Sequence, residues 1–371
     1  MLSFAWIAGL LLVSLYFRNI WKYYKLNERS FVGASANDLP ALTVIVPFRN
    51  EALNLSERIQ SLLQQDYPES KLRVLLINDH STDDFRHHLL DLPSHFLVLN
   101  LPDHLEGKVC ALDYAIEQTH TEWIVCSDAD CIAGKNWLRS FFENELTDDT
   151  IALCGPVRIQ SDGSLLQELQ FLDMIGVMGM TAAGHRGLDF ALANGANLAF
   201  RKSAFVEVGG FKGSEQWLAA DDMWLISKFS SLKDKRILYI DQPAAEVETF
   251  PELSWGSFFK QRIRWAGKTS SYTNPNMLYH IGVAYTFSVY LVAVAILCLL
   301  DISFLSVLVV FFAGRFLADF LYLRFMTKKY GHELDMRSYL VVQFLHIFYI
   351  VLAGFLALGK KRYKWKDRIL N

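Results

Sequence analysis

The chain has 371 residues, a formal net charge of −3 and a hydrophobic content of 52%. This hydrophobic content is high for a soluble protein and is concentrated in a few stretches, which excludes a wholly soluble chain. The length suits about two units of organisation, and we expect no nucleic-acid partner.

The first element is an apolar stretch at the N-terminus. Residues 2–17 carry no charge, no basic residue precedes them, and Arg18 begins a series of basic residues behind them. Residues 34–36 resemble a signal-peptide cleavage site, but a signal peptide carries its basic residues before the apolar run. We therefore predict a transmembrane anchor over residues 1–24, with residues 18–277 on the cytoplasmic side.

Alternating strands and helices follow the anchor. Apolar, β-branched runs predict strands, and apolar residues at helical spacing predict the helices between them. The predicted strands lie at 42–48, 72–79, 95–101 and within 122–130, and the predicted helices lie within 49–65 and 107–119. This alternation predicts an α/β domain over residues 40–250, with a mostly parallel, Rossmann-like sheet and helices on both faces.

Polar residues stand at the ends of the predicted strands. Asn50 and Glu51 follow the first strand, Asp79 follows the second, and Asp128 and Asp130 follow the fourth. Ligands bind beyond the carboxyl ends of the strands in sheets of this kind. We therefore expect these side chains to form one rim.

Helix capping accounts for some of these acids taken singly. Asp79 and Asp83 have the chemistry to cap the following helix, and we expect Asp83 to do so, while Glu51 alone suits a first helical turn. Capping does not require Asp128 and Asp130 at alternate positions, where like charges destabilise each other. Two such carboxylates suit a hard divalent cation, and we predict Mg²⁺ or Mn²⁺ shared with phosphates.

Missing motifs narrow the chemistry. The sequence has neither a Gly-x-x-x-x-Gly-Lys loop nor a Gly-x-Gly-x-x-Gly motif after the first strand, which argues against P-loop ATP chemistry and dinucleotide redox. A metal that holds a diphosphate as it leaves serves transfer from a nucleotide sugar. The five cysteines show no metal-ligand pattern, so we interpret them as reduced core thiols.

Over residues 40–270 the chain resembles the inverting family 2 glycosyltransferases of GT-A fold. The matching blocks, in order, are VIVPFRNEALNL, VLLINDHSTDD, GKVCALDYAI, CSDADCI, GANLAFRKSAFVEVGGF, AADDMWL and QRIRW. Membrane-anchored members similar to this chain include ceramide glucosyltransferase-like and polysaccharide-synthase-like enzymes. The resemblance implies an inverting, metal-dependent glycosyltransferase.

The same resemblance implies a role for single residues in these blocks. Asp130 would ligand the metal together with Asp128, which would also help to fix the nucleotide. The other donor-binding residues would be Pro47, Asn50, Glu51, Asp79, Lys108, Gln261, Arg264 and Trp265.

On the acceptor side, the resemblance makes Asp222 the general base. A carboxylate within hydrogen-bond reach can take the proton of an acceptor hydroxyl as the new bond forms. Family members usually carry Glu-Asp where this chain has Asp221-Asp222, so the first position departs from the pattern. Gly195, Asn197 and Asp221 would shape the acceptor side, with Asn197 facing the sugar.

The C-terminal third indicates a membrane part. Residues 251–277, which contain QRIRW, mix aromatic and basic residues as membrane-surface helices do, and we expect this segment both to lie on the membrane and to touch substrate. Residues 278–358 predict about three hydrophobic membrane segments. Within them Arg315 and Asp319 are four residues apart, and we expect a structural pair on one helix face.

A basic tail, residues 359–371, ends the chain. Three full spans would place this tail outside, against the cytoplasmic bias of basic residues. We therefore expect the Arg315-containing segment to be re-entrant or interfacial and the tail to be cytoplasmic. The tail resembles the basic, Trp-containing tail of ceramide glucosyltransferases, which favours a lipid acceptor.

The predicted function is transfer of a sugar from a nucleotide donor, expected to be a UDP-sugar, to a membrane lipid at the cytoplasmic face. One alternative is a small processive polysaccharide synthase, although such enzymes need more membrane helices for a channel. A second alternative is a membrane scaffold or sensor that keeps the fold without catalysis. The sugar, the acceptor, the metal and the oligomeric state stay open.

Overall fold

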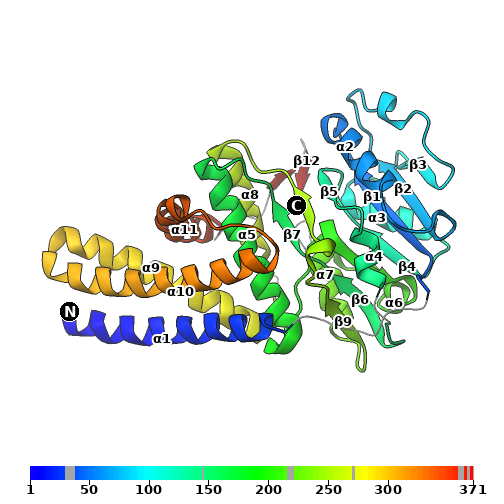
Figure 1. Cartoon of the computed structure of the whole chain (residues 1–371). Helices are drawn as coiled ribbons and strands as arrows, with labels where there is room; N and C mark the ends of the chain where they lie inside the picture. The colour runs from blue at the N-terminus through cyan, green and yellow to red at the C-terminus, as the bar shows by residue number, and fades with distance from the viewer. Residues whose placement is uncertain are drawn as a thin grey trace.

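The computed structural model describes residues 1–29, 38–143, 146–214, 221–269, 272–357, 363–365 and 368–370. An α/β domain lies at one end of the molecule, and long helices extend from it to the N-terminus at the other end (Figure 1). The cleavage-site resemblance at residues 34–36 and most of the basic tail fall outside the described residues.

The α/β domain is built on a seven-stranded sheet in the order β3-β2-β1-β4-β8-β6-β9. The strands β3, β2, β1 and β4 are parallel, β8 is antiparallel to both neighbours, and β9 is parallel to β6. Their bounds are β1 Leu42–Phe48, β2 Leu72–Asn78, β3 Phe96–Asn100, β4 Trp123–Cys126, β6 Thr150–Cys154, β8 Leu198–Arg201 and β9 Arg236–Tyr239. The predicted fold class is confirmed.

Helices cover both faces of the sheet because alternate residues of β1 point in opposite directions. Val44 and Val46 pack with α2 and α4 in one core, whereas Ile45 packs with α3, α6 and α7 in another. All three side chains are fully buried. The helices of the domain are α2 Ala52–Leu63, α3 Lys108–Glu117, α4 Trp137–Phe142, α6 Lys202–Glu207 and α7 Asp221–Phe229.

A small second sheet supports the Asp-Ala-Asp segment. It has the order β5-β10-β7, with β5 Cys131–Ala133 starting directly after Asp130, β10 Val247–Thr249 in the centre and β7 Val157–Ile159 at the edge. Short helical turns join the longer elements at Glu69–Lys71, Arg86–Leu89, Gly184–Leu188, Gly195–Asn197, Pro243–Ala245 and Ile302–Phe304.

Two helices lie between the domain and the long helices. They are α5, Leu165–Ala183, and α8, Trp255–Lys268. α5 contacts β7 on the domain side and α1, α10 and α11 on the other, and α8 contacts α11. The QRIRW block is therefore a helix at the boundary between the two parts of the molecule (Figure 1).

Among the described residues, four helices are long and apolar enough to cross a membrane. They are α1 Leu2–Asn27, α9 Pro275–Leu300, α10 Leu305–Lys329 with the turn before it, and α11 Met336–Ala357. α1, α9 and α10 run side by side and contact one another, whereas α11 is seen nearly end-on (Figure 1). Two short strands follow α11 in the sequence and pair with each other as a hairpin, β11 Tyr363–Trp365 and β12 Arg368–Leu370.

The charged pair inside the helices is structural. Arg315 Nε lies 3.5 Å from Asp319 Oδ2, Tyr16 Oη donates to Asp319 Oδ1 at 2.5 Å, and Arg315 Nη1 donates to Ser288 Oγ at 2.6 Å. The Arg315–Asp319 pair lies on one face of α10, as expected, and the other two bonds join α10 to α1 and α9. α10 is one continuous helix of 25 residues, which argues against a re-entrant segment, whereas the interfacial alternative stays a prediction.

Candidate active site

The parallel strands bring the predicted polar residues to one edge. In the register of the sheet Phe48 lies opposite Asn78, and Ile45 lies opposite Cys126, so the segments that follow β1, β2 and β4 leave the sheet at the same edge. The backbone amide of Asp79 donates to the carbonyl of Phe48 at 2.9 Å, and Ser127 donates likewise to Ile45 at 3.2 Å. The predicted rim therefore exists.

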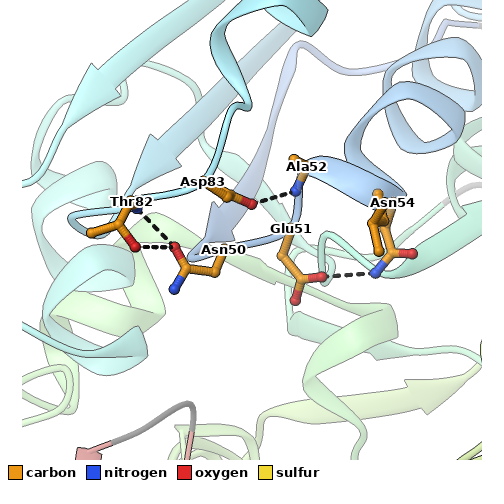
Figure 2. A pocket seen from close by; sticks show the side chains of 7 residues that line it. Asn50, Glu51, Ala52, Asn54, Thr82 and Asp83 are labelled. Atoms are coloured by element: carbon orange, nitrogen blue, oxygen red, sulfur yellow. Dashed lines mark hydrogen bonds between the residues drawn. The ribbon is translucent and has the colours of Figure 1, made fainter.

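A pocket of about 470 Å³ lies beyond the C-terminal ends of β1 and β2. It is lined by Asn50, Glu51, Ala52, Leu53, Asn54, Thr82 and Asp83 (Figure 2). Asn50 has the left-handed backbone conformation, with φ of 52°. Its Oδ1 accepts from the backbone amide of Thr82 at 2.8 Å, and Glu51 Oε2 accepts from Asn54 Nδ2 at 2.7 Å. Two of the predicted donor-binding residues thus line a pocket with their side chains held in place.

Asp83 is a cap, but of a different helix from the one expected. Its Oδ2 accepts from the backbone amide of Ala52, the first residue of α2, at 2.7 Å (Figure 2). The segment after β2 therefore caps the helix that follows β1, because the two strands are neighbours in the sheet. The expectation that Asp83 caps the following helix is wrong.

Asp79 connects β2 to the start of α3. It is buried, and its Oδ2 accepts from the backbone amide of Gly107 at 3.1 Å. Gly107 has a φ of +93°, a conformation that glycine adopts at low cost. This contact fixes the N-terminus of α3 and with it the next residue, Lys108.

Lys108 faces the Asp-Ala-Asp segment. Its Nζ lies 2.7 Å from Asp128 Oδ1. Ligand atoms of Asp128, Asp130 and Cys131 lie within 4.8 Å of one another. Cys131, interpreted from the sequence as a core thiol, is indeed buried, but its sulfur lies 3.7 Å from Asp130 Oδ1.

The electrostatics of Asp130 fit a divalent cation. Burial, and then the charge of Asp128, raise the pKa of the Asp130 carboxyl to about 6, although Lys108 acts in the opposite sense. A carboxylate pair that is destabilised in this way gains most from a cation between its oxygens. Carboxylate oxygens also suit Mg²⁺ and Mn²⁺, so Asp128 and Asp130 are a fitting donor set for the predicted metal.

Arg58 is a second cation near this pair. It lies on α2, which packs on β5, and it is fully buried with its guanidinium 5.2 Å from the ring centre of Trp137. Burial lowers the pKa of Arg58 to about 10, while the charges of Cys131, Asp128 and Asp130 act to raise it. Its Nε and Nη2 have no hydrogen-bond partner among the described residues.

Asp222, the expected base, is held by three groups. Its Oδ2 accepts from the backbone amide of Gly195 at 3.1 Å, its Oδ1 accepts from the amide of Met223 at 2.7 Å, and Lys268 Nζ lies 3.6 Å from Oδ1. The Asp222 side chain is 14% exposed. Asp221 starts α7, and its side chain lies outside the described structure.

The turn Gly195–Asn197 links the two halves of the rim. Ser127, next to Asp128, donates from its hydroxyl to the carbonyl of Ala196 at 2.7 Å, while the amide of Gly195 holds Asp222. One short turn therefore contacts both the residue beside the carboxylate pair and the expected base. Burial and the charge of Asp222 also raise the pKa of Tyr272.

Asn197 does not face a substrate in this structure. It is fully buried; its Oδ1 accepts from Trp137 Nε1 at 2.9 Å, and its Nδ2 donates to the carbonyls of Pro156 and Ala245 at 2.7 and 2.8 Å. The expectation that Asn197 faces the sugar is wrong. Its amide instead fixes the turn that carries Gly195.

The buried charged residue of QRIRW is Arg262, which is not among the predicted site residues. Arg262 Nη2 lies 3.0 Å from Asp173 Oδ2 of α5, and its guanidinium lies 4.2 Å from the ring centre of Trp265. Gln261 Nε2 donates to Glu252 Oε1 at 3.2 Å. Arg264 is half-buried on the same helix.

Pro47 lies within β1, opposite Ile77, and is only partly buried. It is the one predicted donor-side residue that lies inside a strand. The structure thus brings Asn50, Asp79, Lys108, Asp128 and Asp130 to one edge, and the Gly195 turn connects Asp222 to them.

Comparison with known proteins agrees with this geometry. Residues 43–209 match the glycosyl transferase family 2. Relatives named poly-β-1,6-N-acetyl-D-glucosamine synthase occur in Staphylococcus aureus, 27% identical over 276 residues, and in Staphylococcus epidermidis, 26% identical over 270 residues. Each match covers 71% of this chain and 62% of the relative, so the chain spans less than two thirds of those proteins.

A solved structure supports the fold over nearly the whole chain. The mannosyltransferase PcManGT from Pyrobaculum calidifontis, in complex with GDP-Man and Mn²⁺, superposes with a TM-score of 0.62 at 18% identity, covering 97% of this chain and 99% of that one. The fold and its rim define a GT-A glycosyltransferase domain. Residues 43–209 are the part of the chain that matches glycosyltransferase family 2.

Proposed function

We propose that this protein is an inverting, metal-dependent glycosyltransferase that moves a sugar from a nucleoside-diphosphate donor to an acceptor hydroxyl at the membrane. The observation that carries the proposal is the Gly195–Asn197 turn, which contacts Ser127 beside Asp128 on one side and Asp222 on the other. It supports a site in which donor phosphates and a base act on one sugar. A UDP-sugar is the donor we infer from the family resemblance.

Each residue has a distinct part in this reaction. Asn50, Glu51 and the buried Asp79 hold the nucleoside, and Lys108 lies beside the diphosphate together with Asp128. Asp128 and Asp130 would hold a divalent cation, which would supply positive charge for the leaving diphosphate. Arg264 supplies further positive charge from α8.

Asp222 removes the proton of the acceptor hydroxyl as the new bond forms. Two backbone amides, of Gly195 and Met223, donate to its carboxylate and fix its orientation. The transition state at the sugar is oxocarbenium-like, as in glycoside cleavage. A single base that activates the acceptor, with no second carboxylate acting as nucleophile, gives direct displacement and therefore inversion at the anomeric carbon.

The basic residues at the domain-side ends of the helices support a cytoplasmic orientation. Arg18, Lys22 and Lys25 lie in the last turns of α1, and Lys328 and Lys329 lie in the last turn of α10. Basic residues next to membrane helices favour the cytoplasmic side. The protein is then an integral membrane protein, and its α/β domain works at the cytoplasmic face.

A membrane lipid is the acceptor we favour. The space between α1, α9 and α10 is filled by the buried side chains of Tyr16, Phe287, Phe311 and Arg315. A processive synthase needs a passage for its polymer, and this packed three-helix arrangement supplies none among the described residues. Transfer to a lipid that stays in the membrane needs no passage.

A polysaccharide synthase is the second candidate. The relatives in Staphylococcus carry that name, and their match to this chain extends over 276 residues. Under this alternative, the acceptor is the end of a growing glycan, and the passage is formed by further chains or by a partner.

A donor screen tests the proposal. Full-length protein in detergent with Mn²⁺ or Mg²⁺ is given UDP- and GDP-sugars, and release of free nucleotide is followed with and without total lipid extract. We expect release that lipid stimulates and a labelled sugar that moves into the organic phase. Label in a water-soluble polymer would favour the second candidate, and no release from any donor would contradict both.

A further inference from the structure

α11 differs in placement from the other three long helices. α1, α9 and α10 lie in the plane of Figure 1, whereas α11 is seen nearly end-on beside α5 and α8. It packs against α5, α8 and α9. α5 and α8 are the helices at the boundary between the α/β domain and the three-helix arrangement.

The chain enters α11 on the domain side. At the end of α10, Lys329 donates to the carbonyl of Asn27, the last residue of α1, at 2.7 Å and forms an ion pair with buried Asp241, which follows β9. Just before α11, His332 Nε2 lies 2.9 Å from Glu246 Oε1, next to β10. The start of α11 is therefore fixed to the domain.

The middle of α11 is held by charge. Near its centre, His346 Nε2 lies 3.3 Å from Asp173 Oδ1, and Tyr349 donates its hydroxyl to the same carboxylate. Asp173 also pairs with Arg262 of α8 at 3.0 Å. Because Asp173 lies on α5 and Arg262 on α8, the centre of α11 is tied to the two helices at the boundary of the α/β domain.

The hairpin behind α11 also lies on the domain side. Along the direction of α1, α9 and α10, β12 is at the level of the α/β domain and at the opposite end of the molecule from the N-terminus (Figure 1). α11 has 22 residues, so a crossing helix would carry the chain about 33 Å towards the other side.

We propose that α11 lies along the membrane plane with its exposed face in lipid, so that α1, α9 and α10 are the spanning helices and the C-terminal hairpin is on the side of the catalytic domain. The face that α11 turns outwards is apolar and includes Leu340, Phe344, Phe348, Leu352 and Phe355. The opposite face packs on protein through Tyr339, Val342, Tyr349 and Ala353. The lipid surface is therefore the partner of this helix, and Asp173 and Arg262 connect it to the QRIRW helix.

Depth measurements with nitroxide labels test this placement in lipid bilayers. Single cysteines replace Leu340, Phe348 and Leu352 on α11, and Val309, Leu317 and Leu321 on α10 as matched controls, in a background with Cys110 and Cys298 replaced by serine. All six positions are exposed, and each set spans 12 residues, which is about 18 Å along a helix. Phe344 replaces any α11 position that does not tolerate the label.

We expect the three α11 labels to lie at one depth within a few ångström, while the α10 labels spread over about 18 Å less the effect of tilt. A spread on α11 equal to that on α10 would overturn the proposal. Equal depths on both helices would also overturn it, because α10 would then not cross. Depth is read without substrate, so this result is independent of the proposed chemistry.

Discussion

The backbone amide of Gly195 donates a hydrogen bond to Asp222 Oδ2 at 3.1 Å, joining two segments that are 27 residues apart in sequence. The turn that presents this amide is itself fixed by Asn197, whose side chain is fully buried. The orientation of the proposed base is thus set by the Gly195–Asn197 turn.

Replacement of Asp222 by asparagine tests the base. The amide cannot accept the acceptor proton, so we expect Asp222→Asn to lower turnover on the order of a hundredfold or more, with donor binding nearly unchanged. Turnover and the dissociation constant of the donor are measured in parallel. Glu207→Gln, at an exposed position on α6, is the control, and an equal loss of binding and turnover in Asp222→Asn would remove Asp222 from this role.

Replacement of Asp130 by alanine tests the metal site. Because Asp130 and Asp128 are the proposed ligands, we expect Asp130→Ala to abolish the Mn²⁺-dependent part of donor binding, measured by calorimetry with and without chelator. Asp84→Ala, an acid on the same edge with a 92% exposed side chain, should behave as the wild type. Donor turnover that survives chelator in Asp130→Ala would show the metal assignment to be wrong.

Metal affinity should depend on pH below about 6. Burial and the charge of Asp128 raise the pKa of Asp130 to about 6 from the ordinary 3.8, so at lower pH Mn²⁺ must displace a proton. We expect the affinity for Mn²⁺, measured by EPR of the free ion, to fall about tenfold per pH unit below 6 and to level off above it. A flat profile between pH 5 and 7 would contradict the assignment.

The stability of the metal-free protein changes with pH in the opposite direction to the metal affinity. A raised pKa means that the folded protein binds this proton more tightly than the unfolded chain. The metal-free protein should therefore lose stability as pH rises from about 4 to about 6, and Mn²⁺ should restore it in that range. Thermal unfolding with and without Mn²⁺ at each pH measures both effects.

Sequence alone predicts the parallel half of the sheet well. The runs at 42–48 and 72–79 become β1 and β2 because their residues are buried on both faces, and a short continuous run of apolar, β-branched residues indicates such a strand. The rim follows from the rule that ligands bind at strand C-termini. Asp83 shows the limit, because which helix it caps depends on strand order, and strand order is a long-range property.

Burial explains both the site residue that was wrongly selected from the sequence and the two arginines that were missed. Asn197 stands in one of the blocks that carry the family resemblance, but its side-chain amide hydrogen-bonds to Trp137 and to two backbone carbonyls. Arg58 stands between Leu55 and Ile59 on the apolar face of α2, a position that hints at burial. Arg262 is two residues from the selected Arg264, and its burial against Asp173 of α5 depends on tertiary packing that the sequence does not show.

Arg262 should matter for stability as well as for the position of α8. Its pair with Asp173 is buried on both sides, with side chains 3% and 10% exposed, and removing one partner of such a pair costs about 3–5 kcal/mol. We expect Arg262→Met to lower the thermal midpoint in detergent by several degrees, whereas Lys260→Met, at an exposed position of the same helix, should not. Equal midpoints for the two variants would show that the pair contributes little.

The most direct test of the central claim is the anomeric configuration of the product. Purified protein with Mn²⁺ is given the α-linked nucleotide sugar that the donor screen selects, and the new glycosidic linkage is assigned by NMR. Direct displacement assisted by Asp222 predicts a β linkage in the product. An α linkage would mean retention of configuration, and the single-displacement mechanism proposed for this site would be wrong.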